Sequence, residues 1–180
     1  MFTLAPLRQL LRRAMIPKNR SKGLDMPAAD APQNKLIVFT VGQGSYAIDV
    51  AAVAEIASGE GIVPQRGAPG GVIGVVTVRD RVTPVFDLHW KFDLPQPLYW
   101  EGQRLLFIET HAGPLALMVD AVEEVATVSG DALQAFDAAG SNRRLGYLQG
   151  VLRIGQRIVL WVDPALLVPG GISEAALRVA

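Results

Sequence analysis

The amino-acid sequence predicts an all-β fold made of two similar barrels of about five strands each, with a few short helices. Short β-rich runs interrupted by Gly and Pro are typical of a small sandwich or barrel. An internal repeat indicates that one such unit occurs twice. The length of 180 residues suits one compact domain or two very small ones. This length rules out a large multidomain enzyme.

Four hairpins are expected, each consisting of a strand, a tight turn and a second strand. Their ranges are 36–50, 71–88, 104–120 and 148–162. The turn of the second is placed at Asp80-Arg81, and Pro84 in its returning strand is expected at an edge or a bulge. Short helical segments are predicted at 51–56, with Asp49 as the cap, at 121–126 and at 164–167.

The repeat has two parts. A hairpin followed by Val53, Glu55 and Ile56 recurs as a hairpin followed by Val122, Glu124 and Val125. Later, Gly74 precedes Asp87 by thirteen residues, and Gly150 precedes Asp163 by the same thirteen. Either half alone has a marginal core, so two halves gain by burying a common face. Coincidental alternation is the alternative to a true duplication.

Charge divides the chain into a tail and a body. Residues 1–35 carry seven Lys or Arg and two Asp or Glu, whereas residues 36–180 carry ten and fifteen. We expect a basic tail and linker over 1–34, a β-rich body over 35–170, and a C-terminal tail or short helix over 171–180. The acidic body argues against nucleic-acid binding, which needs clustered Lys and Arg.

The start of the tail has the pattern of a short basic amphipathic helix before Pro17. It could bind an anionic membrane surface or a partner groove, and the alternatives are a frayed extension or a start codon placed too early. Arginines interrupt its apolar residues and no stretch is long enough to span a bilayer, so neither secretion nor a membrane span is expected. Its apolar face would hold Leu4, Leu7, Leu11 and Met15.

No catalytic or metal-binding pattern is found. The chain has no cysteine, which excludes disulfides and thiolate chemistry. His89 and His111 lack neighbours at metal-ligand spacing and are expected in surface or turn positions. Ser45 has no adjacent base, and Glu123 and Glu124 are expected to point apart, which makes a poor acid/base pair. A recognition surface is therefore expected in place of an active site.

Three segments, 39–56, 74–92 and 148–167, together resemble the CheW-like domain family. The resemblance covers about residues 35–170. One departure is Asp80, where the family usually has Gly, and Asp tolerates a left-handed turn better than most residues. The residues that match in register are Tyr46, Ile48, Asp49, Val53, Glu55, Ile56, Gly74, Val75, Arg79, Pro84, Val85, Asp87 and Leu88.

The resemblance implies two intertwined, five-stranded SH3-like barrels that act as a non-catalytic coupling protein in bacterial chemosensory arrays. Its implied partners are the cytoplasmic tip of chemoreceptors and the regulatory domain of a CheA-type histidine kinase. It implies a cytoplasmic protein at the inner face of the membrane, held there only through receptors, without a cofactor or a metal ion. The open alternatives are a related motility pathway such as type IV pilus twitching, or a divergent module whose basic tail selects a membrane or another partner.

The resemblance also implies two binding sites. A kinase-binding surface is expected at Leu148, Val151 and Arg153 of the second barrel. Glu55 and Arg79 are expected to form an ion pair at the rim of a receptor-binding groove. That groove would be formed by Ile37, Val50, Val53, Glu55, Ile56, Arg79 and Val122.

Overall fold

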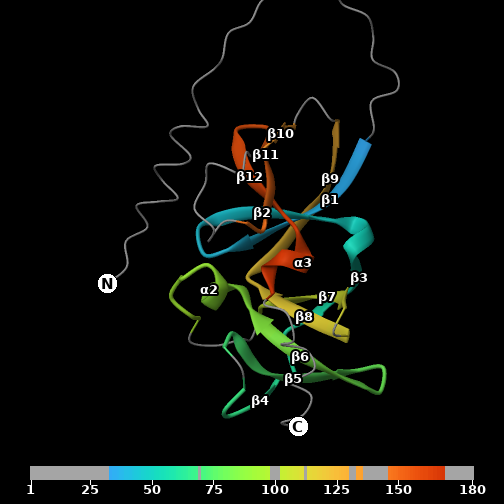
Figure 1. Cartoon of the computed structure of the whole chain (residues 1–180), viewed down its shortest axis with the longest axis vertical. Coiled ribbons are helices and arrows are strands. Elements are labelled where there is room, and N and C mark those ends of the chain that lie inside the picture. Colours follow the sequence, from blue (N-terminus) through green and yellow to red (C-terminus); the bar gives the residue numbers. More distant parts are fainter. Residues whose placement is uncertain are drawn as a thin grey trace, which may run out of the picture. The chain divides into compact units, whose positions relative to one another are not determined.

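The computed structural model describes residues 33–68, 70–97, 102–111, 113–129, 133–135 and 146–168 (Figure 1). Residues 1–32 and the expected C-terminal tail lie outside these residues, as does most of the stretch between β10 and β11. The expected linker reached residue 34, but Gln33 and Asn34 already belong to β1. The elements are β1 Gln33–Val41, β2 Gly44–Asp49, η1 Val50–Ala52, β3 Val53–Ser58, β4 Val63–Pro64, β5 Val72–Val78, β6 Arg81–Asp87, α2 Leu88–Lys91, β7 Arg104–Thr110, β8 Gly113–Val119, β9 Ala121–Ser129, β10 Leu133–Ala135, β11 Leu148–Ile154, β12 Arg157–Val162 and α3 Pro164–Leu167.

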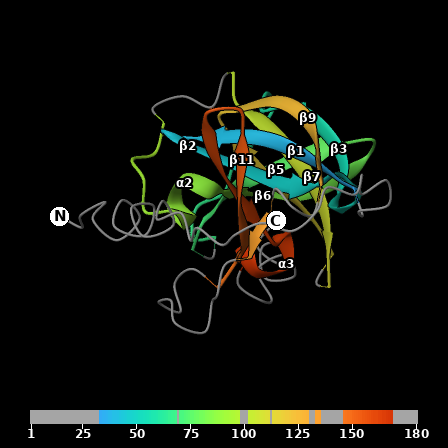
Figure 2. The same cartoon turned by 90° about the horizontal axis from the view of Figure 1, so that it is seen from above.

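The strands form two sheets of six, which confirms the mainly β prediction and corrects the expected five strands in each. The sixth strands are the short β4 and β10. The first sheet has the order β10-β11-β12-β2-β1-β9, and the second has the order β3-β7-β8-β6-β5-β4. Figures 1 and 2 show the first sheet stacked over the second.

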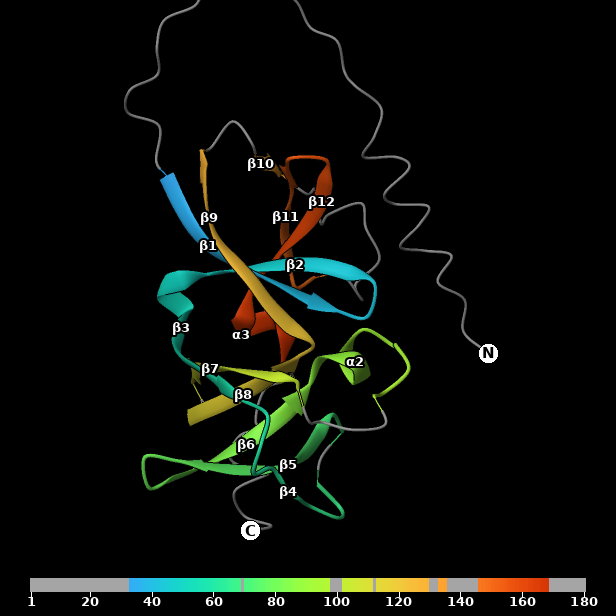
Figure 3. The ribbon, with the colours of Figure 1, turned by 180° about the vertical axis from the view of Figure 1, so that it is seen from behind.

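The two sheets have equivalent strand orders: replacing each strand of one sheet by its counterpart in the other repeat gives the order of the other sheet. Each repeat supplies a hairpin, a single strand, a short strand and a second hairpin, so β1–β6 correspond to β7–β12. The third strand of each repeat crosses to the other sheet: β3 pairs with β7, and β9 pairs with β1. Figure 3 shows β9 running away from β8 to join β1. The repeat noted in the sequence therefore corresponds to a repeat of strand topology, and each sheet contains strands of both repeats.

The spacing from Gly74 to Asp87 recurs from Gly150 to Asp163 because each stretch forms the same hairpin, which begins after a register shift and ends at a capping aspartate. The register shifts by one residue between Val72 and Gly74, and the same shift recurs between Leu148 and Gly150. A Cβ on Gly74 would lie 2.3 Å from the Val63 carbonyl oxygen, so only glycine fits against β4.

An aspartate closes each of these two units. Asp87 and Asp163 are the N-cap residues of α2 and α3, and their carboxylates accept hydrogen bonds from the backbone N–H two residues ahead, at 2.8 and 2.9 Å. The backbone N–H of Asp87 donates to the Gly71 carbonyl, and that of Asp163 donates to the Tyr147 carbonyl, each over 2.8 Å. The same cap thus ends both repeats.

The helices predicted at 51–56 and 121–126 are wrong. Asp49 does cap a turn, accepting from the Ala51 N–H at 2.8 Å, but η1 ends at Ala52 and the chain continues as β3. Residues 121–126 belong to β9. Each segment has only two β-branched residues and is otherwise Ala and Glu, so pairing with a neighbouring strand outweighs the local helix propensity. The short helix predicted at 164–167 is confirmed.

The second hairpin turns one residue earlier than predicted. Arg79 and Asp80 both have positive φ, 48° and 62°, which is the conformation of a two-residue type I′ turn. Asp80 therefore adopts the left-handed conformation for which the family usually has glycine. Pro84 pairs with Val75 of β5, whereas the pairing of β6 with β8 begins at Val85, so the ring removes no donor from the β6–β8 ladder.

A polar junction joins the two sheets where β8 leads into β9. Asp120 accepts a hydrogen bond from the Gly42 N–H at 2.6 Å, and its own N–H donates to the Thr40 carbonyl at 2.9 Å. Its other carboxylate oxygen lies 3.3 Å from His89 Nε2. His89 is 4% exposed, so the prediction of a surface or turn position is wrong for this residue, whereas His111 is exposed.

Aromatic rings form a second contact between the sheets. Phe92, which follows α2, stacks on Tyr46 of β2 with ring centroids 4.4 Å apart and lies 5.5 Å from the ring of Tyr147. Burial raises the pKa of the Tyr147 hydroxyl to about 12, and burial together with the charge of Tyr147 raises the pKa of Tyr46 further. The Lys91 amine lies 5.4 Å from the centre of the Tyr147 ring, and burial lowers its pKa.

Candidate functional site

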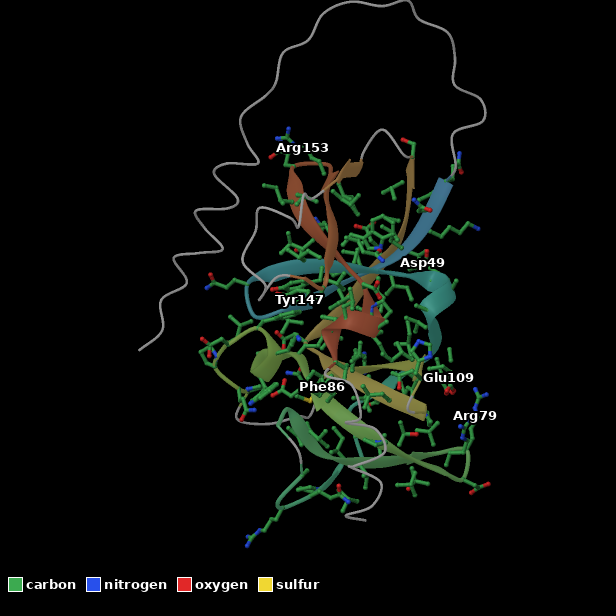
Figure 4. All side chains as sticks on the ribbon, viewed as in Figure 1. Asp49, Arg79, Phe86, Glu109, Tyr147 and Arg153 are labelled. Carbon is green, nitrogen blue, oxygen red and sulfur yellow. The ribbon has the colours of Figure 1, made fainter. Side chains whose placement is uncertain are left out.

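The expected ion pair between Glu55 and Arg79 is present. The Arg79 Nη2 atom lies 3.3 Å from Glu55 Oε2. Glu55 is held on β3, and Arg79 occupies the type I′ turn between β5 and β6, so the contact joins the crossing strand to the last hairpin of its own repeat. Arg79 is largely exposed, which leaves its guanidinium accessible to a partner (Figure 4).

A β-bulge at Ala54 determines which side chains of β3 share a face. Val53 pairs with Ile108 and Glu55 pairs with Phe107, so Ala54 has no opposite residue. Strand partners project to the same face, and Ile56 pairs with Leu106, two residues from Ile108. Val53 and Ile56 therefore share one face, although they are three residues apart. Glu55 projects to the opposite face, where Arg79 meets it.

Strand β9 repeats this arrangement in the first sheet. Phe39 pairs with Val122 and Val38 pairs with Glu124, so Glu123 is the residue without an opposite. Ile37, two residues from Phe39, pairs with Val125. The strand thus presents Val122 and Val125 on the face of β1 that carries Ile37. Val125 is 60% exposed and Val122 half-buried.

The expected groove residues differ in accessibility. Ile37 is buried, so it supports this face from beneath and is not itself open to a partner. Val50 and Val53 are half-buried in the segment that leads from β2 through η1 into β3, and Ile56 is 43% exposed. Strand pairing brings Ile37 and Val122 into one sheet, while Val53 and Ile56 belong to the other.

The three residues expected to bind the kinase have unlike environments. Leu148 is only 6% exposed and pairs with the buried Val162, so it is a core residue and the prediction of a surface contact is wrong for it. Val151 is half-buried and Arg153 is exposed. In Figure 4, Arg153 and Arg79 lie at opposite ends of the view.

Two features of β9 were missed from the sequence. Val125 was noted as part of the repeat but not as a candidate binding residue. Glu123 and Glu124 do not point apart, because both contact the guanidinium of Arg157, at 2.5 and 2.6 Å. The only sequence signal for this contact was the repeat, which aligns Glu124 with Glu55.

The described residues contain little that resembles catalytic chemistry. Among them, no three His, Cys, Asp or Glu side chains are grouped so as to hold a metal ion. No helix in the described part of the chain is both long and apolar enough to cross a membrane. The described surface carries two ion-paired clusters, Glu55–Arg79 and Glu123–Glu124–Arg157, and exposed aliphatic side chains such as Ile56 and Val125. Features of this kind are suited to protein recognition.

Comparison with known proteins agrees with this geometry. A model of the CheW-like domain matches residues 35–170. The chain is 28% identical over 142 residues to the chemotaxis protein CheW of Rhizobium meliloti, covering 79% of this chain and 92% of that protein. It is 26% identical over 140 residues to the chemotaxis protein CheW of Treponema pallidum, covering 76% and 82%. The crystal structure of the scaffolding protein TtCheW from Thermoanaerobacter tengcongensis superposes with a TM-score of 0.69 at 19% identity, covering 79% of this chain and 97% of that one.

Proposed function

The chain belongs to the CheW-like domain family, and from this membership we infer that it is a chemosensory coupling adaptor that links chemoreceptors to a CheA-type histidine kinase. The observation that carries the inference is the match over residues 35–170, which takes in both repeats. The relatives that share this region over most of their own length are named chemotaxis proteins. The role requires two binding surfaces and no catalytic group.

We place the receptor-binding surface on the crossing strands. The side chains of Val53 and Ile56 share one face of β3, and Val122 lies on the equivalent face of β9. The Glu55–Arg79 pair is on the other face of β3, which is the edge strand of its sheet, so the pair would contact the partner only around this edge and would set its orientation there. An exposed ion pair adds at most about 1 kcal/mol to stability, so its main contribution is to specificity.

We place the kinase-binding surface on the β11–β12 hairpin, where Val151 and Arg153 remain accessible. Leu148 would act there only as core support. We further propose that the protein works in the cytoplasm, at receptor arrays that it reaches through the receptors. A role in a related pathway such as pilus-driven motility would use the same fold with other receptors and another kinase.

Calorimetric titration of the full chain tests this function. The partners are the isolated regulatory domain of a CheA-type kinase from the same genome and, separately, a receptor-tip fragment. Saturable binding to both, and a ternary complex in size-exclusion chromatography, is the expected result. Failure of a folded sample to bind either partner would refute the coupling role and direct attention to the basic tail.

Reversing the charges of the Glu55–Arg79 pair is expected to reduce receptor binding without unfolding the chain. Glu55→Arg and Arg79→Glu should each lower the affinity for the receptor-tip fragment. Each substitution puts two like charges where the wild type has an ion pair of 3.3 Å, so the two side chains repel each other and separate. The double exchange should recover part of the loss. Glu60→Arg, at an exposed position just after β3, is the control and should bind as the wild type does. Unchanged binding in both single variants would remove this pair from the interface.

A further inference from the structure

Arg157 makes the most concentrated charge contact among the described residues outside the candidate receptor surface. It is the first residue of β12, and its two terminal nitrogens bind two neighbouring carboxylates of β9, Glu123 at 2.5 Å and Glu124 at 2.6 Å. All three side chains are partly exposed. A fork of this kind fits a guanidinium, which presents several N–H donors in one plane, better than it fits an ammonium group.

The β9 bulge is what allows two consecutive glutamates to reach one arginine. In a regular strand, successive side chains point to opposite faces. Glu123 is the unpaired residue of the bulge, and the extra residue turns its side chain toward the side on which Glu124 projects. Arg157 therefore binds both carboxylates only while the bulge is present, and this contact favours the bulged strand over a regular one.

The bulge has a direct consequence for the apolar side chains of β9. With it, Val122 and Val125 both share the face of Ile37. Without it, strict alternation would send one of the two valines to the opposite face, toward the core of the first sheet, which contains Val38 and Ala126. A one-residue change in register would thus remove an exposed valine from the candidate surface.

The internal repeat supports this reading independently. The bulge of β3 at Ala54 corresponds to that of β9 at Glu123, and Glu55 corresponds to Glu124. In both repeats a glutamate directly after the unpaired residue is ion-paired with an arginine of the last hairpin, although the arginines occupy different positions: Arg79 lies in the turn, whereas Arg157 is the first residue of the strand after it. The same device occurs twice, and only the first copy belongs to the expected receptor site.

We infer that Arg157 is a positioning residue for receptor binding: by holding Glu123 and Glu124 it fixes the β9 bulge that keeps Val122 and Val125 on the binding face. The inference rests on the proposed receptor-binding function. Arg157 need not touch the receptor, because its effect passes through the backbone of β9.

The test compares Arg157→Ala with Arg66→Ala, which truncates an exposed arginine in the loop before β5, distant in sequence from β9 and outside the expected sites. In titrations with the receptor-tip fragment, the affinity should fall about tenfold for Arg157→Ala and remain unchanged for Arg66→Ala. Combining Glu123→Gln with Glu124→Gln should give a similar loss, and adding Arg157→Ala to that pair should cost little more. Arg157→Lys should recover only part of the binding. Titration with the kinase regulatory domain should be unaffected in the variant that combines Glu123→Gln with Glu124→Gln, because both substitutions lie on β9 and outside the β11–β12 hairpin.

Hydrogen exchange gives a readout that does not depend on any partner. The backbone amides of 121–125 should exchange faster in folded Arg157→Ala than in Arg66→Ala. If folded Arg157→Ala binds the receptor tip as strongly as the wild type does, or if amide exchange in its β9 is unchanged, the inference is overturned. Should Arg157→Ala not fold, the two glutamine substitutions carry the same test. Absence of binding by the wild type would refute the proposed function, and exchange alone would then decide whether Arg157 fixes the bulge.

Discussion

Replacing Val53 by aspartate is expected to weaken binding of the receptor-tip fragment by about 30-fold or more while leaving the kinase regulatory domain bound as before. The loss follows from placing a carboxylate in an apolar contact, and truncating or disrupting an interface anchor typically costs at least about 2 kcal/mol. Val53 is half-buried at the first position of β3, so an aspartate there keeps access to water and the sheet should remain folded.

The matched control is Val63→Asp. Val63 is 62% exposed on β4, which belongs to the same sheet and lies outside the expected site. Its binding to both partners should equal that of the wild type, with calorimetry as the measurement and circular dichroism as the check on folding. Joint loss of receptor and kinase binding in Val53→Asp, together with loss of the folded spectrum, would show that Val53 belongs to the core and not to an interface.

The hairpins could be predicted from the sequence because their signals are local. Alternating β-branched residues and a two-residue turn determine where β1 meets β2 or where β7 meets β8. The repeat was also visible, because Gly74 and Gly150 follow the same register shift at the same distance before each capping aspartate. The Glu55–Arg79 contact came from the family pattern, since nothing local indicates that a turn at Arg79 returns to β3.

The bulges explain why β3 and β9 were predicted as helices. A bulge adds one residue, so apolar side chains on one face of the strand become three positions apart, as Val53 and Ile56 are, and as Val122 and Val125 are. Three is also the spacing of neighbours on a helix face, and periodicity alone cannot separate the two cases. The exchange of β3 and β9 between sheets depends on pairing with strands that are distant in the sequence, such as Ser58 with Arg104, and a local pattern carries no signal for such pairing.

The burial of His89 had no sequence signal either. Its position one residue after Leu88 in a short helix suggests solvent, and only the arrival of Asp120 from another hairpin gives its Nε2 a partner at 3.3 Å. Polar residues at the joint between two sheets are determined by both sheets together. They are therefore the residues that single-strand reasoning places least well.

The chain is expected to lose stability steeply in alkali, between about pH 10 and pH 12, because of the tyrosines at the joint between the sheets. Burial raises the pKa of Tyr147 to about 12, while an unfolded tyrosine ionises near 10. The folded state therefore keeps a proton that the unfolded state releases, and unfolding becomes more favourable as the pH rises through this window. Each pKa unit corresponds to about 1.4 kcal/mol, so Tyr147 alone contributes a loss of about 2 kcal/mol by pH 12.

Tyr46 acts in the same direction, since its pKa is raised by burial and by the charge of Tyr147. Lys91 acts in the opposite direction: burial lowers its pKa, so its unfolded form binds the proton more tightly and the folded state gains as the pH rises toward the ordinary lysine value. The free energy of unfolding, measured with urea at about pH 8 and about pH 11.5, gives the net effect of these three groups. Tyr147→Phe, which has no hydroxyl to ionise, should lose clearly less stability between the two pH values than the wild type. An equal loss in both proteins would show that ionisation of Tyr147 does not set the alkaline limit, and that another group, such as Tyr46, destabilises the chain first.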